Sequence, residues 1–214
     1  QRQLLYDEED VREALPKSVA AERKLRRING DVEIEAFVAD VTAENAETFL
    51  DGIDLVMDGT DNFDTRFLLN DVCFYTGTPY IYGGIVGSRA MSAAFVPGET
   101  LCLRCLIAPP EGEVETCESV GILSPVSGIT ASLQAAEAWK FLTGSPEALK
   151  RSVTYVDVWH NLFKEIAYGE PSSHCPVCSK KTYPALHPKR EEAVQPVKMC
   201  GRNTVQLQHP AAFD

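Results

Sequence analysis

The apolar positions of the chain change repeatedly between the spacing of helices and the spacing of strands. Apolar side chains that recur every three or four residues predict helices, whereas alternating positions or short apolar runs predict strands. By these criteria we expect helices at residues 17–28, 43–50, 63–75 and 124–142, and strands at residues 32–38, 53–57, 79–85, 91–96, 153–158 and 162–166. Strands that alternate with helices are typical of a sheet with helices on both faces.

The predicted strands are expected to form one mixed sheet. The apolar run at residues 53–57 is typical of a buried parallel strand. Residues 91–96 are expected to return antiparallel beside the preceding strand, and the last two strands to close the sheet. The predicted fold class is therefore α/β, with a doubly wound mixed sheet. In the long helix, Val126, Ile129 and Leu133 recur at helical spacing.

The composition changes after Cys178. Residues 179–198 contain three prolines, scattered charges and few apolar side chains, which predicts a tether outside the core. Residues 197–207 are expected to begin a small β unit. We therefore expect one domain at residues 1–178, followed at residues 179–214 by a linker and the start of an incomplete extension.

The charge balance and the hydropathy exclude two classes of partner. The chain carries 20 basic and 31 acidic side chains, a formal net charge of −11, and such a surface repels nucleic-acid phosphates. No apolar run reaches the roughly 20 residues that a membrane span needs, so no membrane partner is expected. Because the chain begins at Gln1 without a secretory leader, we expect a cytoplasmic protein of which this chain is a piece.

The seven cysteines include two Cys-x-x-Cys pairs, Cys102 with Cys105 and Cys175 with Cys178. Without a secretory leader, cysteines are more often metal ligands or reactive thiols than disulfides. Two such pairs supply the four thiolates of a tetrahedral zinc site with no open position, so the predicted Zn²⁺ is structural. The alternative is two unrelated redox or disulfide pairs, but neither pair opens a thioredoxin-like helix after a strand.

A second candidate site is the turn at residues 58–62, directly after a predicted strand. Ligands of open α/β sheets bind beyond the carboxyl ends of the strands, where Asp61 could hold Mg²⁺ on a nucleotide. The alternative is an ordinary turn in which Asp61 or Asn62 caps the next helix. Gly83-Gly84-x-x-Gly87 does not clearly precede a helix, so it is not expected to cradle a phosphate.

Single residues add weaker candidates. Arg2 and Lys17 could neutralise phosphates near a helix start, although lone basic residues are usually just solvated. Cys117 lies in a polar stretch outside both cysteine pairs, and it is either a nucleophile or sulfur acceptor, or an inert loop thiol. Cys73 is expected in the core. A Ser-His-Asp hydrolase is disfavoured because the chain has no Gly-x-Ser-x-Gly sequence.

Taken together, an ordered series of motifs resembles the ThiF/MoeB/HesA family, the bacterial relatives of ubiquitin-activating enzymes. The resemblance runs from Gln1 to Cys178 and implies a Rossmann-like sheet. Its marks are Gln1-Arg2-Gln3, Pro16-Lys17, Asp58-Gly-Thr-Asp-Asn62, Arg66 with Asn70-Asp71, Thr116-Cys117-Glu118, Gly128-x-x-x-Ser132-Leu-Gln-Ala135-x-Glu137-Ala138 and the two cysteine pairs.

This resemblance implies an adenylyltransferase that uses ATP and Mg²⁺ to activate the C-terminal glycine carboxylate of a ubiquitin-like sulfur-carrier protein as an acyl-adenylate. It implies that Arg2 and Lys17 contact the phosphates. It also implies that Asp61 holds the metal with Asn62 beside it, and that Cys117 can join covalently to the activated carrier. The four paired cysteines would hold structural zinc.

The resemblance further implies a sulfur donor, such as a cysteine desulfurase, and a homodimer. Candidate interface aromatics are Phe74, Tyr75, Tyr80 and Tyr82. The sequences 58–63 and 199–206 favour a ThiS-type carrier of thiamin biosynthesis, while a MoaD-type carrier of molybdenum-cofactor biosynthesis shares the other motifs.

One departure from the family concerns the N-terminus. The glycine-rich strand–turn–helix of the family, and the acidic residue after its next strand, would precede Gln1. We therefore expect a truncated chain that binds ATP poorly by itself, and a non-catalytic carrier-binding module is the alternative. A dinucleotide-dependent oxidoreductase is disfavoured because the chain has no Gly-x-Gly-x-x-Gly turn.

Overall fold

The computed structural model of the chain describes residues 5–108, 120–188, 196–198 and 205–207. It divides the chain into two compact units, Gln1–Val41 and Thr42–Asp214. None of the helices in the described ranges is both long enough and apolar enough to span a membrane.

The first unit is helical where it has regular structure. It contains α1 (Glu8–Arg12) and α2 (Lys17–Ile28), and α2 begins directly after Pro16, as its sequence predicts. The strand expected at residues 32–38 is wrong, because this segment is not in any strand of the structure. A strand exists only where a neighbour accepts and donates its backbone hydrogen bonds, and the described residues of this unit contain no such neighbour.

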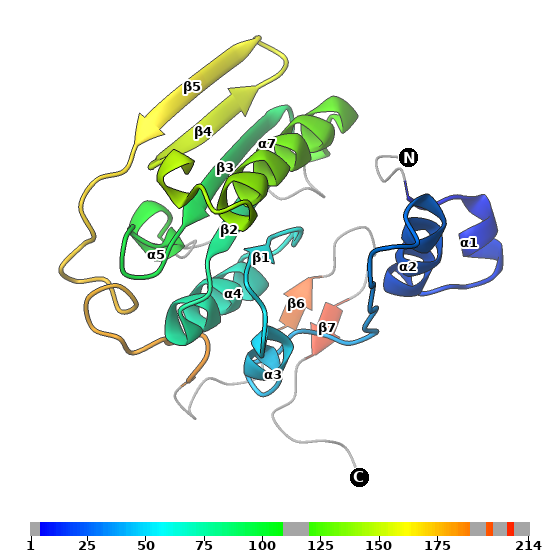
Figure 1. Ribbon diagram of the computed structural model, residues 1–214, viewed down its shortest axis with the longest axis horizontal. Helices are drawn as coiled ribbons and strands as arrows, with labels where there is room; N and C mark the ends of the chain where they lie inside the picture. The colour runs from blue at the N-terminus through cyan, green and yellow to red at the C-terminus, as the bar shows by residue number, and fades with distance from the viewer. Residues whose placement is uncertain (1–4, 109–119, 189–195, 199–204, 208–214) are drawn as a thin grey trace. The chain divides into compact units, whose positions relative to one another are not determined.

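The second unit is built on a five-stranded sheet in the order β1-β2-β3-β4-β5 (Figure 1). Its strands are β1 (Val56–Met57), β2 (Tyr80–Val86), β3 (Arg89–Phe95), β4 (Ser152–Asp157) and β5 (Leu162–Ala167). β1 pairs parallel with β2, and all other neighbours are antiparallel, which confirms a mixed sheet. β1 is shorter than expected and lies at the sheet edge, where Met57 is 48% exposed, so the prediction of a buried strand is wrong.

The helices of this unit are α3 (Ala46–Leu50), α4 (Phe63–Thr76), the short α5 (Leu103–Leu106), α7 (Ser124–Leu142) and the 3-10 turn η1 (Pro146–Ala148). Of these, α4 and α7 match their predicted positions closely, α3 begins three residues later than expected, and α5 and η1 were not predicted. Asn62 caps α4 by accepting the Thr65 amide at 2.8 Å, and Gly77 ends it in the left-handed region at φ +82°. The local signals that start and stop a helix therefore act here as they do in isolated peptides.

α4 and α7 cover opposite faces of the sheet. Tyr80 and Tyr82 of β2 share one hydrophobic core with Phe67 of α4. Gly83, which alternation points to the other face, lies against Gln134 of α7. The doubly wound arrangement is confirmed. The buried residues of α7 are nevertheless mostly not the apolar positions noted in its sequence, since they are Val126, Thr130, Gln134, Glu137 and Ala138.

The segment after Cys178 packs more closely than expected. Tyr183 and Leu186 are buried members of the main core, and the Tyr183 hydroxyl donates to the Phe74 carbonyl at 3.4 Å. The prediction of a tether outside the core is therefore wrong for residues 179–188, because two apolar side chains suffice to hold this proline-containing segment on α4. Further along, β6 (Pro196–Lys198) and β7 (Val205–Leu207) pair antiparallel, as expected for a small β unit.

Candidate functional site

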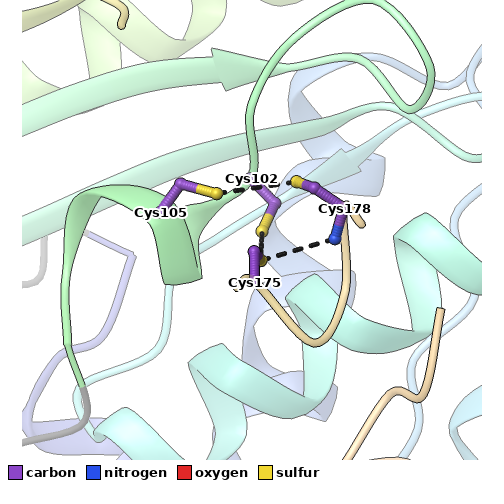
Figure 2. Close-up of side chains that lie close together, drawn as sticks. All are labelled: Cys102, Cys105, Cys175 and Cys178. Carbon is purple, nitrogen blue, oxygen red and sulfur yellow. Dashed lines mark hydrogen bonds between the residues drawn. The ribbon is translucent and has the colours of Figure 1, made fainter. Parts of the chain in front are cut away.

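The two cysteine pairs meet in space and form one cluster (Figure 2). Their four Sγ atoms all lie within 4.8 Å of one another. Cys102 Sγ lies 3.6 Å from Cys175 Sγ, and Cys105 Sγ lies 3.7 Å from Cys178 Sγ. In a tetrahedral site with metal–sulfur bonds of about 2.3 Å, the sulfur atoms are separated by about 3.8 Å, whereas a disulfide requires about 2 Å. The cluster therefore fits one tetrahedral metal ion and does not fit two separate disulfides.

Tight turns aim both sulfurs of each pair at the same point. Cys102 precedes α5 and Cys105 lies within it, and the Cys105 amide donates to the Cys102 carbonyl at 2.9 Å. In the second pair, the Cys178 amide donates to Cys175 Sγ at 3.4 Å. Because all four ligand positions would be taken by protein, the metal can stabilise the fold but has no open position for a substrate.

The thiols of the cluster favour a cation. A hydrogen bond with the Cys178 thiol, followed by burial, raises the pKa of Cys102. Burial is also the main cause that raises the pKa of Cys105. Thiolates this close together repel one another unless a positive ion compensates their charge, and metal binding releases the protons of its thiol ligands for that reason.

Two adjacent polar residues of α4 hold the first cysteine pair and the chain beyond the second pair. The Asp71 carboxylate, which is fully buried, accepts from Arg104 Nε at 2.7 Å and from Arg104 Nη2 at 2.9 Å. It also accepts the Ala185 amide at 2.8 Å, which lies beyond the second pair. Next to it, Asn70 Oδ1 accepts the Leu103 amide at 2.9 Å. We call Asn70 and Asp71 the α4 clasp, since these two residues bind the first cysteine pair and the chain beyond the second pair to one helix.

We expect Asp71→Asn to weaken metal binding about tenfold, because ligand-orienting residues outside the coordination shell typically contribute that much. The substitution keeps the size of the side chain but leaves the Arg104 guanidinium, whose side chain is only 10% exposed, without its counter-ion. Competition with a chromophoric chelator measures the affinity. Asp64→Asn, in the exposed first turn of the same helix, is the matched control. Equal affinities for both variants would contradict a role of the clasp.

The second candidate site, the loop from Asp58 to Asn62, has a fixed backbone. Asp58 Oδ1 accepts the Thr60 amide at 2.8 Å and the Thr60 hydroxyl at 2.7 Å, and its Oδ2 accepts the Tyr80 hydroxyl at 2.7 Å. Arg66 Nη2 donates to the Thr60 carbonyl at 2.7 Å. The sequence predicts either a metal-holding Asp61 or a helix cap at Asp61 or Asn62, and the cap is confirmed for Asn62. Asp61 is exposed at the carboxyl end of β1, and it belongs to no cluster of metal-ligating side chains in the described ranges.

A single exposed carboxylate is compatible with Mg²⁺ in one way only. Mg²⁺ demands six oxygen ligands and is held in proteins by one or two carboxylates together with substrate phosphates and water. Asp61 therefore fits a metal that arrives with a nucleotide, and it does not fit a resident metal site. Two hollows of this unit lie elsewhere: one of about 160 Å³ between α7 and the strands β3 and β4, and one of about 700 Å³ beside α3.

The arginine of α4 that supports this loop is itself deeply buried. The Arg66 guanidinium lies 5.5 Å from the Phe63 ring centroid and 5.6 Å from that of Tyr82. Its Nε is 3.7 Å from Asp58 Oδ2 and has no hydrogen-bond partner among the described residues. Charge attraction and the aromatic rings hold this cation, since the geometry does not permit a bidentate pair with Asp58.

The remaining candidate residues lie outside the described residues, in the first unit or in the core. Arg2 and Cys117 lie outside the described residues. Lys17 is the first residue of α2, where its ammonium is 5.9 Å from the centroid of the Tyr6 ring. It belongs to the unit Gln1–Val41, whereas Asp61 belongs to the other unit. Cys73 is fully buried and burial raises its pKa, which confirms a core position.

The first two glycines of the glycine-rich run form part of a strand. Gly83 and Gly84 both lie in β2, which confirms that they do not form a phosphate loop. A Cβ at Gly83 would come within 2.6 Å of the Gln134 side-chain amide, and a Cβ at Gly84 would lie 2.1 Å from the Tyr82 hydroxyl. The glycines therefore make room for one polar side chain on each face of the sheet.

The expected interface aromatics are mostly core residues. Phe74, Tyr80 and Tyr82 are each at most 5% exposed, so they are unavailable as surface contacts and their assignment is wrong. Tyr75 is 48% exposed and packs against the rings of Tyr183 and His187. The aromatic character of these positions indicates a core just as well as an interface, and only the packing distinguishes the two.

The α4 clasp and the contacts around Asp58 were not predicted as functional units. Asn70, Asp71, Arg66 and Gln134 stood out only as members of motifs. The available signal was the presence of charged or amide side chains inside helices expected to be buried, because such groups require partners.

Comparison with known proteins places the chain in a well-defined group. A model of the ThiF family matches residues 1–177. The sulfur carrier protein ThiS adenylyltransferase of Bacillus subtilis is 42% identical over 97% of this chain, which spans 61% of that relative. The sulfur carrier protein adenylyltransferase of Thermus thermophilus is 35% identical over 94% of the chain, which spans 73% of that relative.

The fold also has solved counterparts. The crystal structure of Escherichia coli MccB with MccA-N7isoASN matches 83% of this chain and 55% of that chain, with a TM-score of 0.65 and 22% identity. At this identity the likeness establishes the fold alone.

Proposed function

Because the chain belongs to the ThiF family, we propose that the native protein uses ATP to adenylate the C-terminal carboxylate of a ubiquitin-like sulfur-carrier protein of the ThiS type. The observation that carries the proposal is the 42% identity over nearly the whole chain to an adenylyltransferase named for that carrier. The fixed loop that exposes Asp61 at the carboxyl end of β1 is compatible with it.

The proposed reaction joins two anions. A carrier carboxylate oxygen attacks the α-phosphorus of ATP, the bond to the β-phosphate oxygen breaks, and pyrophosphate leaves with the electron pair. The product is a mixed anhydride of the carrier and AMP, whose carbonyl is then open to a sulfur nucleophile. Because the difficulty is charge repulsion, the protein needs cations and positioning rather than an acid–base pair.

In this proposal the charged candidate residues act on the phosphates and their metal, and Cys117 acts on the carrier. Asp61 holds the Mg²⁺ that accompanies the nucleotide, with Asn62 beside it as the helix cap. Lys17 and Arg2 place positive charge on the phosphates. When bound, Mg²⁺ supplies compensation of the phosphate charge. Cys117 is proposed as the thiol that receives the activated carrier, and AMP is the leaving group of that step.

The metal of the cysteine cluster is proposed to be zinc. Four thiolates in tetrahedral arrangement are typical of structural Zn²⁺, which has no redox chemistry of its own. The proposal also includes a homodimer and a sulfur donor such as a cysteine desulfurase. We also propose that the domain includes residues 179–188, whose Tyr183 and Leu186 lie in its core, and that an extension follows them.

ATP–pyrophosphate exchange tests the proposal. The native protein, supplied with purified ThiS-type carrier, is expected to incorporate labelled pyrophosphate into ATP, and the exchange should require the carrier's terminal glycine. If a MoaD-type carrier supports exchange and a ThiS-type carrier does not, the substrate is a MoaD-type carrier and the proposed one is wrong. Carrier binding that is independent of ATP, with no exchange for either carrier, would contradict adenylylation and support a binding module.

A further inference from the structure

The side chain of Gln134 extends from α7, over Gly83 of β2, to the loop that carries Asp61. Gln134 Nε2 donates to the Asp58 carbonyl at 2.8 Å and to the Ile81 carbonyl at 3.2 Å. The Ile81 carbonyl also accepts the Asp58 amide at 2.9 Å, as part of the pairing of β1 with β2. Gln134 therefore acts at the point where the β1–β2 hydrogen bonds end and the loop begins.

The environment of Gln134 makes these two bonds important. Gln134 is 7% exposed. If its amide were removed, the Asp58 carbonyl would lose this hydrogen bond and would have little access to water in its place. Gly83 has no side chain in the space that the Gln134 amide occupies. The loss of a buried hydrogen-bond partner typically costs about 1–3 kcal/mol, and here the cost would fall on the first residue of the loop.

The loop is anchored at each residue that flanks Asp61 except glycine. Asp58 is held through its carbonyl by Gln134 and through its carboxylate by Tyr80. Thr60 is held by Asp58 and Arg66, and Asn62 is fixed as the cap of α4. Burial, followed by the charge of Asp58, raises the pKa of Tyr80 well above its usual value, so its hydroxyl remains a donor.

From this geometry we infer that Gln134 is a positioning residue for Asp61, which it presents to the metal of a metal–nucleotide substrate by fixing the Asp58 carbonyl. The inference rests on the proposed function. It adds that α7, on the opposite face of the sheet from α4, sets the geometry of the nucleotide loop. A preorganised carboxylate binds its ion without the loss of loop freedom that a mobile one would suffer.

Gln134→Met tests the inference, because methionine fills similar space but donates no hydrogen bond. Hydrogen–deuterium exchange of the amides of residues 58–60 is expected to accelerate, because Asp58 loses an anchor. In ATP–pyrophosphate exchange, the Mg²⁺ concentration for half-maximal rate should rise about tenfold, as for other residues that orient a metal ligand. The rate at saturating Mg²⁺ should fall much less. Ser132→Ala, on the exposed side of the same helix, is the control.

Gly83→Ala provides a second route to the same displacement. The new methyl group would meet the flexible end of Gln134 at 2.6 Å, so the amide moves while the fold is retained. The same increase in Mg²⁺ requirement is expected. Its control is Gly128→Ala in α7, where a Cβ meets nothing within 4 Å.

The outcomes separate this inference from the proposed function. Unchanged loop exchange and unchanged Mg²⁺ dependence in both variants would overturn it, as would a lower maximal rate without a change in Mg²⁺ dependence. If the native protein shows no carrier-dependent exchange, the proposed function fails, while amide exchange in Gln134→Met still tests the anchoring of the loop. If both readouts respond in both variants while the controls behave like the native protein, the inference holds.

Discussion

Replacement of Cys175 by serine is expected to release the metal and to cost on the order of 4 kcal/mol of folding stability, which is at the upper end of what single substitutions cause. For a protein of this size, that corresponds to a fall of about 8–16 °C in unfolding temperature. The physical reason is that the cluster joins segments 73 residues apart in sequence, so its loss frees the chain around Cys175 from α5.

Metal content by atomic emission and thermal unfolding by circular dichroism measure this result. Cys73→Ala is the matched control, because Cys73 is equally buried but lies outside the cluster. The control should keep one metal per chain. A serine variant that retains its metal and its unfolding temperature would contradict a structural role for the four cysteines.

The second large effect is expected at Asp61. Asp61→Asn should lower the rate of carrier-dependent ATP–pyrophosphate exchange by about 10²–10³-fold, the usual effect of removing one preorganised electrostatic group. The side chain is exposed and the loop backbone is fixed by Asp58, Thr60 and Arg66, so the unfolding temperature should not change. The loss should be partly reversed by raised Mg²⁺, since in the proposed role of Asp61 the substitution weakens metal binding rather than the fold.

Asp64→Asn is the control for charge alone. Asp64 is an exposed carboxylate three residues further on, in the first turn of α4. It should leave the exchange rate unchanged. If both variants lose activity equally, the effect belongs to the general charge of this surface and not to Asp61.

Local signals in the sequence predicted much of the second unit correctly. Asn62 and Gly77 mark the two ends of α4 because a side-chain cap and a left-handed glycine act within a few residues. The expected strand at residues 32–38 shows the limit of that argument. Alternation describes what a segment can do, but pairing depends on a neighbour that the segment itself does not specify.

The same distinction applies to the candidate sites. The Cys-x-x-Cys spacing alone determined that each pair could present two sulfurs to one point, since two intervening residues form a tight turn. That the two pairs share a centre follows from the packing of residues 175–178 beside α5. The hydrogen bond between Asp71 and the Ala185 amide, beyond the second pair, could not be predicted from local sequence, because it joins residues 114 positions apart.

The amino-acid sequence by itself therefore determined the boundaries of α2, α4 and α7, the α/β class, the ligand chemistry of the cysteines and the motifs of the ThiF family, because each depends on neighbouring residues or on residue type. The tertiary structure decided which polar side chains are buried together and which loop they hold. Gln134 illustrates the reason: it lies 76 residues from Asp58, and only the crossing of α7 over β2 brings its amide to that carbonyl.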